Sequence, residues 1–283
     1  MEPTLQQFAE QSLISEFDRS LDQFLELINE KYNYDFRQYA HASLRRRVVQ
    51  AMHSMGYLDL ESLGEKVLTD SNSFYDLIQC LTVTVSEMFR NPPYYLALRE
   101  KVVPKLRKYP SLKVWIAGCS TGEEVYSLAI LLQEEGLLDR TIIYATDINP
   151  RSLVHAERGI FEVDLVRKFT RSYQLSGGKR SLSDYYTAAF GAAKFRDDLK
   201  ENIIFADHSL ATDAVFSEAQ LISCRNVLIY FDRQLQDKAL GLFHDSLCPQ
   251  GFLGLGTSET VLFSKHSPQF VSIAEDERIF RKS

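Results

Sequence analysis

The sequence has few cysteines and no excess of positive charge, and both absences narrow the possible functions. Its 283 residues include four widely separated cysteines without a Cys-x-x-Cys pair, so no thiolate zinc site and no bound metal are expected. Cys119 and Cys224 lie in or beside apolar runs and are interpreted as buried, reduced thiols, which predicts a cytoplasmic location. The net charge of -6 disfavours nucleic acid as a partner, because phosphate binding usually requires a basic domain.

Long apolar runs are also absent. None approaches the roughly 18 residues that a membrane-spanning helix needs, so we expect no membrane insertion. Residues 1–10 contain two glutamates and no basic apolar block, which argues against a signal peptide.

The residues that are present divide the chain into two regions. With 45% apolar residues, the chain can bury a large core. Apolar residues at helical spacing predict a helical domain over residues 1–80, with a link near 70–92. Over 81–283, apolar strand patterns alternate with amphipathic helices, which predicts βαβ units and a mostly parallel sheet. Residues 173–200 lack a long apolar period and are predicted to be an insertion of short strands or loops.

Individual elements of the second region follow from the same patterns. Strands are expected at 112–117, 141–146, 202–205, 221–224 and 252–255, with a terminal hairpin at 270–273 and 278–280. Helices are expected from Tyr94 to Leu106, from Glu123 to Glu135 and from Leu235 to Leu247. A turn at Pro249-Gln-Gly251 is expected before the strand at 252–255.

The loop after the strand at 112–117 has features of a nucleoside site. It reads Gly118-Cys-Ser-Thr-Gly122, and the next strand ends at Asp147, where an acid can accept hydrogen bonds from ribose hydroxyls. Neither Gly-x-Gly-x-x-Gly nor Gly-Lys-Ser/Thr is present, which excludes a P-loop. Glu123 and Glu124 open the helix and would repel a pyrophosphate. The pattern favours a cationic nucleoside without phosphates, such as S-adenosylmethionine, over the alternative that both glutamates are ordinary first-turn residues.

Two further groups of polar residues allow more than one interpretation. Arg37, Arg45, Arg46 and Arg47 lie within eleven positions of an otherwise acidic region, and form either a docking face or a solvated helix surface.

The second group follows the strand at 221–224. Arg225 and Asn226 stand at the sheet edge where ligands bind, and Tyr230 offers a hydroxyl. The alternative is an ordinary helix start with packed aromatic side chains.

Four segments carry a family resemblance. They are Thr84–Arg90 (TVSEMFR), Gly118–Ser127 (GCSTGEEVYS), Ala145–Ile148 (ATDI) and Ser223–Phe231 (SCRNVLIYF). Together they resemble the chemotaxis receptor glutamate O-methyltransferases of the CheR type, from about residue 20 to the end. The resemblance implies an α/β fold: an S-adenosylmethionine-dependent methyltransferase (Rossmann-like) doubly wound sheet. It also implies a small all-helical N-terminal domain and a small inserted β subdomain.

The resemblance also implies roles for the matching positions. Arg90, beside donor and substrate, and Tyr230, near the reacting methyl, are the expected catalytic residues. Arg90 could instead form a structural ion pair with Glu87 or Glu100. Of the two adjacent glutamates, the alignment favours Glu124 without excluding Glu123. The expected cofactor-binding residues are Thr84, Ser86, Arg90, Gly118, Glu123, Glu124, Asp147, Ser209, Leu210, Asn226 and Val227.

Three departures from the family pattern bear on these roles. Val125 stands where many relatives have proline, and Ser209-Leu210 where many have Asn-Leu. The segment 176–196 does not resemble the β subdomain with which some members grip a peptide at the receptor C-terminus. Direct binding to the methylation region of the receptor is therefore expected.

The implied reaction moves a methyl group from S-adenosylmethionine to glutamates of a chemoreceptor cytoplasmic coiled coil, with S-adenosylhomocysteine as product. A glutamate has a pKa of about 4.3, so it is ionised at neutral pH and needs no general base. Arg45, Arg46 and Arg47 are expected to dock the acidic receptor surface. The protein is expected to act as a monomer.

Other functions remain open from the sequence. One is a methyltransferase for a small molecule or RNA. Another is a regulatory module that binds the cofactor without turnover, which Val125 and Ser209 allow. A dinucleotide-dependent oxidoreductase is disfavoured by the missing Gly-x-Gly-x-x-Gly motif and by the two adjacent glutamates.

Overall fold

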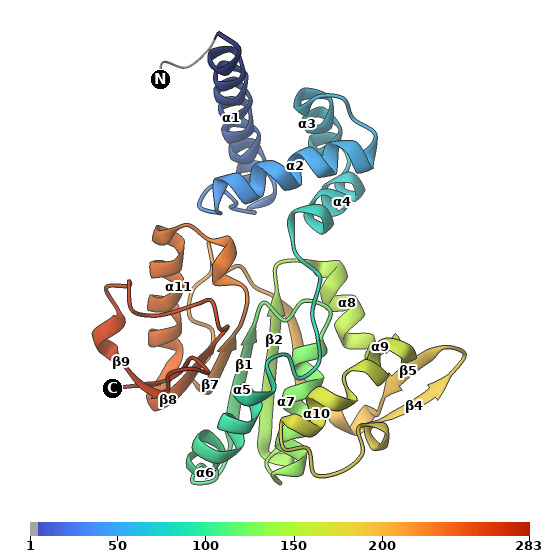
Figure 1. The fold of residues 1–283 in the computed structure, drawn as a ribbon, viewed down its shortest axis with the longest axis vertical. Helices are drawn as coiled ribbons and strands as arrows, with labels where there is room; N and C mark the ends of the chain where they lie inside the picture. The colour runs from blue at the N-terminus through green and yellow to red at the C-terminus, as the bar shows by residue number, and fades with distance from the viewer. Residues whose placement is uncertain (1–4) are drawn as a thin grey trace. The chain divides into compact units, whose positions relative to one another are not determined.

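The structure, a computed structural model, describes the backbone of residues 5–283 and the side chains from residue 16 onward. Residues 1–4, part of the stretch in which no signal peptide is expected, lie outside the described residues. The chain forms two compact units (Figure 1). One contains the residues up to Val83 together with Tyr230–Leu235, and the other contains Thr84–Ile229 and Gln236–Ser283.

The first unit is helical, as the apolar spacing predicts. Its helices are α1 (Leu5–Tyr32), α2 (His41–Met55), α3 (Leu60–Thr69) and α4 (Ser71–Leu81). Asp59 begins α3 by accepting from the Ser62 amide at 2.7 Å, and Asp70 begins α4 by accepting from the Asn72 amide at 3.1 Å. These caps separate two short helices that are divided by a single residue. None of the described helices combines the length and the apolarity needed to cross a membrane.

A segment far along the chain completes the first unit. Tyr39 and Phe231 form an isolated antiparallel bridge, and their ring centroids lie 4.9 Å apart. The Asp232 amide donates to the Gln38 carbonyl at 2.8 Å. The Tyr230–Leu235 segment therefore packs as part of the helical unit.

The second unit is built on a seven-stranded sheet in the order β6-β2-β1-β7-β8-β10-β9. The strands are β1 (Leu112–Ala117), β2 (Thr141–Asp147), β6 (Ile203–Asp207), β7 (Ala219–Cys224), β8 (Leu247–Leu255), β9 (Phe270–Ala274) and β10 (Ile279–Lys282). From β6 to β8 all pairs are parallel, and β10 and β9 form the predicted antiparallel hairpin. The order extends from β1 in both directions, which creates a topological switch between β1 and β7.

Strand β8 corrects the expected turn at Pro249–Gly251. The strand begins at Leu247, directly after the preceding helix, and contains the turn residues. Between two paired positions, β7 advances by two residues, from Ala219 to Leu221, whereas β8 advances by five residues, from Leu247 to Phe252. The turn residues therefore form a bulge within the strand, where Gln250 has a φ of 63°.

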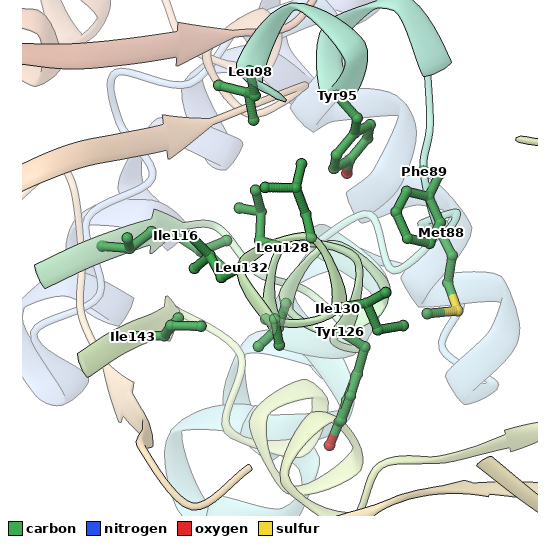
Figure 2. Packing of buried hydrophobic residues seen from close by; sticks show 14 of the residues in the cluster. Met88, Phe89, Tyr95, Leu98, Ile116, Tyr126, Leu128, Ile130, Leu132 and Ile143 are labelled. Carbon is green, nitrogen blue, oxygen red and sulfur yellow. The ribbon is translucent and has the colours of Figure 1, made fainter. Parts of the chain in front are cut away.

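Helices lie along the sheet (Figure 1). They are α5 (Pro92–Ala97), a π-helical turn (Leu98–Val102), α6 (Val103–Leu106), α7 (Glu123–Glu134), α8 (Pro150–Arg158) and α11 (Arg233–Ser246). Every residue of α7 from Val125 to Leu132 is buried, so this helix is enclosed on all sides. Figure 2 shows Leu128 and Leu132 of α7 near Ile116 of β1. Trp115, on the opposite face of β1, lies 5.4 Å from the Phe243 ring of α11.

The inserted subdomain is a second, antiparallel sheet that begins earlier than the expected residue 173. Its strands are β3 (Ile160–Glu162), β5 (Ala192–Phe195) and β4 (Tyr186–Ala189), in that order, with α9 (Val163–Lys168) and α10 (Thr170–Leu175) between β3 and the hairpin. Glu134, the last residue of α7, ties this subdomain to the main sheet. Its Oε1 accepts from the hydroxyls of Tyr173 at 2.5 Å and Tyr185 at 2.9 Å.

Candidate functional site

The carboxyl ends of three neighbouring strands meet where the sheet changes direction. Gly118 follows β1, Asp147 ends β2, and Asn226 lies just beyond β7. Because the strands are parallel, these residues from distant parts of the sequence share one edge of the sheet. This edge is where an open α/β sheet binds ligands.

Gly118 starts the loop in a conformation that suits glycine alone. Its φ is +74°, and its amide donates to the Thr146 carbonyl at 2.8 Å, which ties the loop to β2. A Cβ atom here would lie 2.4 Å from Val227 Cγ2. The glycine thus lets the loop after β1 approach the loop after β7.

Asp147 holds the same loop from the end of β2. Its Oδ2 accepts from the Ser120 amide at 2.8 Å and its Oδ1 from the Asn149 amide at 2.9 Å. Burial raises the pKa of Asp147, although these two amide bonds oppose the rise. A carboxylate has about four acceptor positions, so Asp147 can still accept from a ligand hydroxyl.

Ser120 leaves a polar atom unused at this edge. Its Oγ is buried and has no hydrogen-bond partner among the described residues. The residue has a φ of 51°, an uncommon conformation for a residue other than glycine. A buried hydroxyl without a partner indicates that a ligand or water completes the site.

The adjacent glutamates that open α7 have different surroundings. Glu123 is only 4% exposed, and its carboxylate accepts from Thr121 Oγ1 at 2.7 Å and from Ser86. Burial raises the pKa of Glu123. Glu124 instead accepts from Ser223 Oγ at 2.5 Å and pairs with a guanidinium of the β7 loop. Each oxygen of the Glu124 carboxylate therefore already has a partner in the protein.

Arg225 supplies that guanidinium, and the partners of its side chain lie within the protein, which disfavours the ligand-binding role that the sequence left open. Its side chain is 1% exposed and lies 3.1 Å from Glu124 Oε2. It also donates to the Arg90 carbonyl at 2.7 Å and to Asn91 Oδ1 at 3.1 Å. The guanidinium stacks over the Tyr94 ring, 4.1 Å from its centroid. Arg225 therefore joins the β7 loop to the segment around Arg90.

Arg90 lies in an unusual stretch of backbone. Its neighbours Phe89 and Asn91 have φ values of 52° and 59°, both in the left-handed region. In the described part of the chain, Arg90 forms no ion pair with Glu87 or Glu100, which were the structural alternatives. Its side chain is half-buried and available to a ligand or substrate.

The residues before Arg90 contact the loop after β1. The Thr84 carbonyl lies 3.4 Å from Thr121 Oγ1, and the Ser86 hydroxyl hydrogen-bonds the Glu123 carboxylate. The structure therefore places both of these expected cofactor contacts at the start of α7.

Asn226 and Val227 are held by a residue that the sequence analysis missed. Both amides donate to the Glu259 carboxylate, at 2.9 Å and 2.8 Å, and the Ile229 amide joins them at 3.3 Å. Glu259 is 4% exposed, and burial raises its pKa, although the amide bonds oppose the rise. The Gly-Thr-Ser-Glu sequence after the strand at 252–255 was the only local signal.

Ser209 and Leu210 lie in a turn just after β6. Ser209 Oγ accepts from the Ala211 amide at 3.3 Å, and the Ser209 amide donates to Asp213 Oδ2 at 2.8 Å. The hydroxyl thus supports the turn and keeps its hydrogen for donation. Leu210 is 8% exposed. The amide of the preceding residue, His208, donates to the Asp147 carbonyl at 3.3 Å, which places the turn beside the end of β2.

Tyr230 belongs to the first unit, as does Arg47. The Arg47 guanidinium lies 4.8 Å from the centroid of the Tyr230 ring and donates to the Leu81 carbonyl at 2.8 Å. The Tyr230 carbonyl accepts from the Ala40 amide at 2.8 Å. Arg47 therefore has structural partners, whereas a docking residue was expected.

The other arginines of the expected docking face differ in whether they form ion pairs. Arg37 pairs with Asp35 at 2.8 Å and with Glu26, and Arg45 lies 3.4 Å from Asp18. Arg46 is exposed and forms no ion pair within the described residues. Local carboxylates thus neutralise part of this basic face.

Thiol and metal chemistry receive no support from the described residues. The four cysteines are free, and burial raises the pKa of Cys119 and Cys224, which disfavours the reactive thiolate. No group of three or more His, Cys, Asp or Glu residues there could hold a metal ion.

Comparison with known proteins gives matches over both units. Residues 84–277 match the family described as "CheR methyltransferase, SAM binding domain", and residues 19–82 match "CheR methyltransferase, all-alpha domain". The chain is 58% identical over 259 residues to "Putative methyltransferase Cher3" of Pseudomonas putida KT2440, covering 92% of this chain and 95% of that protein. It is 28% identical over 252 residues to "Chemotaxis protein methyltransferase" of Listeria innocua, covering 88% and 93%. These matches and the observed sheets confirm the predicted fold class.

Proposed function

Because the chain belongs to the CheR methyltransferase family, we propose that it methylates glutamate side chains of a chemoreceptor cytoplasmic domain. The methyl donor is S-adenosylmethionine, and the products are glutamate methyl esters and S-adenosylhomocysteine. The observation that carries this proposal is the sheet edge at which Gly118, Asp147 and Asn226 meet. It unites the loop, the acid and the polar residue of three motifs from separate parts of the sequence.

The residues at this edge fit S-adenosylmethionine. Asp147 retains acceptor positions for ribose hydroxyls, and Ser120 offers a buried hydroxyl that has no partner in the described part of the chain. Of the two glutamates at the start of α7, Glu124 is paired with Arg225, so Glu123 is the one whose carboxylate can disfavour a phosphate and favour a cation. When bound, this cofactor supplies an electrophilic methyl group.

The protein's part in the reaction is to orient the acceptor. The substrate carboxylate is already ionised at neutral pH, so no base has to activate it. Arg90, fixed between left-handed residues and through its carbonyl by Arg225, can hold one carboxylate oxygen through a charge-assisted hydrogen bond. The hold must remain moderate, since tight binding of the ground state would slow transfer. Tyr230 is proposed to shape the methyl site or donate a hydrogen bond.

Receptor docking is assigned to the basic face of α2. Arg46 is exposed and forms no ion pair with the side chains described from residue 16 onward, and Arg45 is next to it in the sequence, whereas Arg47 is held by Leu81 and Tyr230. An acidic receptor surface complements these charges. We propose direct engagement of the methylation region, without a tethered receptor peptide.

The test is transfer of labelled methyl groups to a purified receptor cytoplasmic domain. Methyl esters release methanol in alkali, whereas N-methyl groups do not, so alkali-labile label on the receptor is the expected result. Asp147→Asn should bind the cofactor much more weakly, and Arg90→Ala should lose turnover while still binding cofactor. Asp164→Asn, at an exposed aspartate of α9, is the matched control and should behave as wild type.

Three outcomes would contradict the proposal. Label on RNA or on a small molecule in place of the receptor would indicate another methyltransferase. Cofactor binding without transfer would indicate a regulatory module. Unchanged turnover by Arg90→Ala would remove Arg90 from the reaction.

A further inference from the structure

One buried carboxylate organises the loop after β7. Glu259 Oε1 accepts from the amides of Val227 at 2.8 Å and Ile229 at 3.3 Å. Its Oε2 accepts from the amides of Asn226 at 2.9 Å and Gly256 at 2.6 Å. Four backbone donors from two loops, one after β7 and one after β8, thus converge on a side chain that is 4% exposed.

The surroundings of this carboxylate are built for close approach. Asn226 has a φ of 60°, a left-handed conformation that needs support from its neighbours. A Cβ atom on Gly256 would lie 2.7 Å from Glu259 Oε2 and 2.9 Å from the Asn226 amide nitrogen. The glycine is therefore required for the β8 loop to reach the β7 loop.

We propose that Glu259 is a positioning residue of the cofactor site, which holds Asn226 and Val227 in their binding conformation without itself touching the cofactor. This inference rests on the proposed function. All four backbone donors are saturated by the carboxylate, so the side chain of Asn226 and the Val227 contact with Gly118 are left to define the site. Glu259 acts by fixing the backbone of the loop after β7. This effect is separate from the attraction of its negative charge for a cation.

The first variant is Glu259→Gln. Each carboxylate oxygen accepts two amides, so whichever position the new NH2 group takes, two backbone donors face another donor. The second variant, Gly256→Ala, keeps the carboxylate and its charge but pushes the two loops apart. Both should weaken binding of S-adenosylmethionine and S-adenosylhomocysteine alike, by about tenfold or more, as loss of a supporting residue does in other sites.

Glu134→Gln is the matched control. Glu134 also has a buried carboxylate that accepts several hydrogen bonds, but from Tyr173, Tyr185, the Lys179 amide and the Arg99 guanidinium. Its replacement should lower the thermal stability and leave both cofactor affinities unchanged. Calorimetric titration of the full chain with each of the two ligands provides the affinities.

The outcomes separate this inference from the proposed function. Selective loss of S-adenosylmethionine binding in Glu259→Gln, with normal binding by Gly256→Ala, would overturn positioning and favour a charge effect. Unchanged affinities in both variants would overturn the inference outright. If wild type binds neither ligand, the proposed function fails. In that case, hydrogen exchange at the amides of residues 226–229 still tests whether Glu259 holds the loop. The exchange rate should rise in Glu259→Gln and not in Glu134→Gln.

Discussion

Replacing Arg225 by methionine should destabilise the second unit strongly. The guanidinium is buried, lies 3.1 Å from the Glu124 carboxylate, and donates to the Arg90 carbonyl at 2.7 Å. Removing one partner of a buried ion pair costs about 3–5 kcal/mol, because an uncompensated charge remains. The carbonyl that loses its donor adds about 1 kcal/mol. At about 2–4 °C per kcal/mol for a unit of this size, a loss of about 4–6 kcal/mol lowers the melting temperature by about 15 °C.

The assay is denaturant unfolding followed by tryptophan fluorescence. Trp115 is the only tryptophan and is buried in β1, so its emission reports on the second unit alone. A double-mutant cycle with Glu124→Gln should show coupling of at least about 1 kcal/mol, because this second change removes the buried charge that Arg225→Met leaves without its partner. Arg196→Met, at an exposed ion pair with Asp198, is the control and should change stability by less than about 1 kcal/mol.

Two results would refute this reasoning. Additive effects of Arg225→Met and Glu124→Gln would show that the pair is not an energetic unit. A variant with wild-type stability and lost cofactor binding would restore the ligand-binding role that the structure argues against.

Two further predictions concern the expected site residues. Binding of S-adenosylmethionine should weaken as the pH is lowered, and at a higher pH than the ordinary aspartate pKa of about 3.9 would give, because burial raises the pKa of Asp147 and protonation removes an acceptor. Calorimetry should show this dependence in wild type and not in the weakly binding Asp147→Asn, and a flat wild-type profile would contradict it. Arg47→Gln should lower the stability of the helical unit by about 1–2 kcal/mol through loss of the Leu81 and Tyr230 contacts. Arg46→Gln should leave thermal unfolding unchanged and raise KM for the receptor. Equal stability of the Arg46 and Arg47 variants would contradict a structural role for Arg47 alone.

The sequence predicts elements whose pattern is local. The first strand and the helix that follows the Gly118–Gly122 loop lie at or within one residue of the predicted bounds, because apolar runs between clear turn residues determine both. The bulge at Pro249–Gly251 has the same turn residues but lies inside a strand, since pairing with β7 extends on both sides of it. The pairing of β3 with β5 was missed because neither short strand has a distinctive period.

Side-chain direction at the site could not be predicted from the sequence. The position of Arg225 at the sheet edge follows from its motif, yet its partners Tyr94 and Asn91 come from more than 130 residues earlier in the chain. Glu259 meets Asn226 only because β8 lies beside β7 in one register. Such contacts depend on tertiary packing, which a single sequence does not reveal.

The membership of Tyr230–Leu235 in the helical unit makes the two units inseparable as genetic modules. An exchange of residues 1–83 between relatives would bring in a new partner for a segment encoded some 150 codons downstream. Backbone pairing between Gln38 and Asp232 would tolerate this, but the ring contact of Tyr39 with Phe231 demands matched side chains. Chimeras should therefore carry both segments from one parent, and the two segments should change together as sequences diverge.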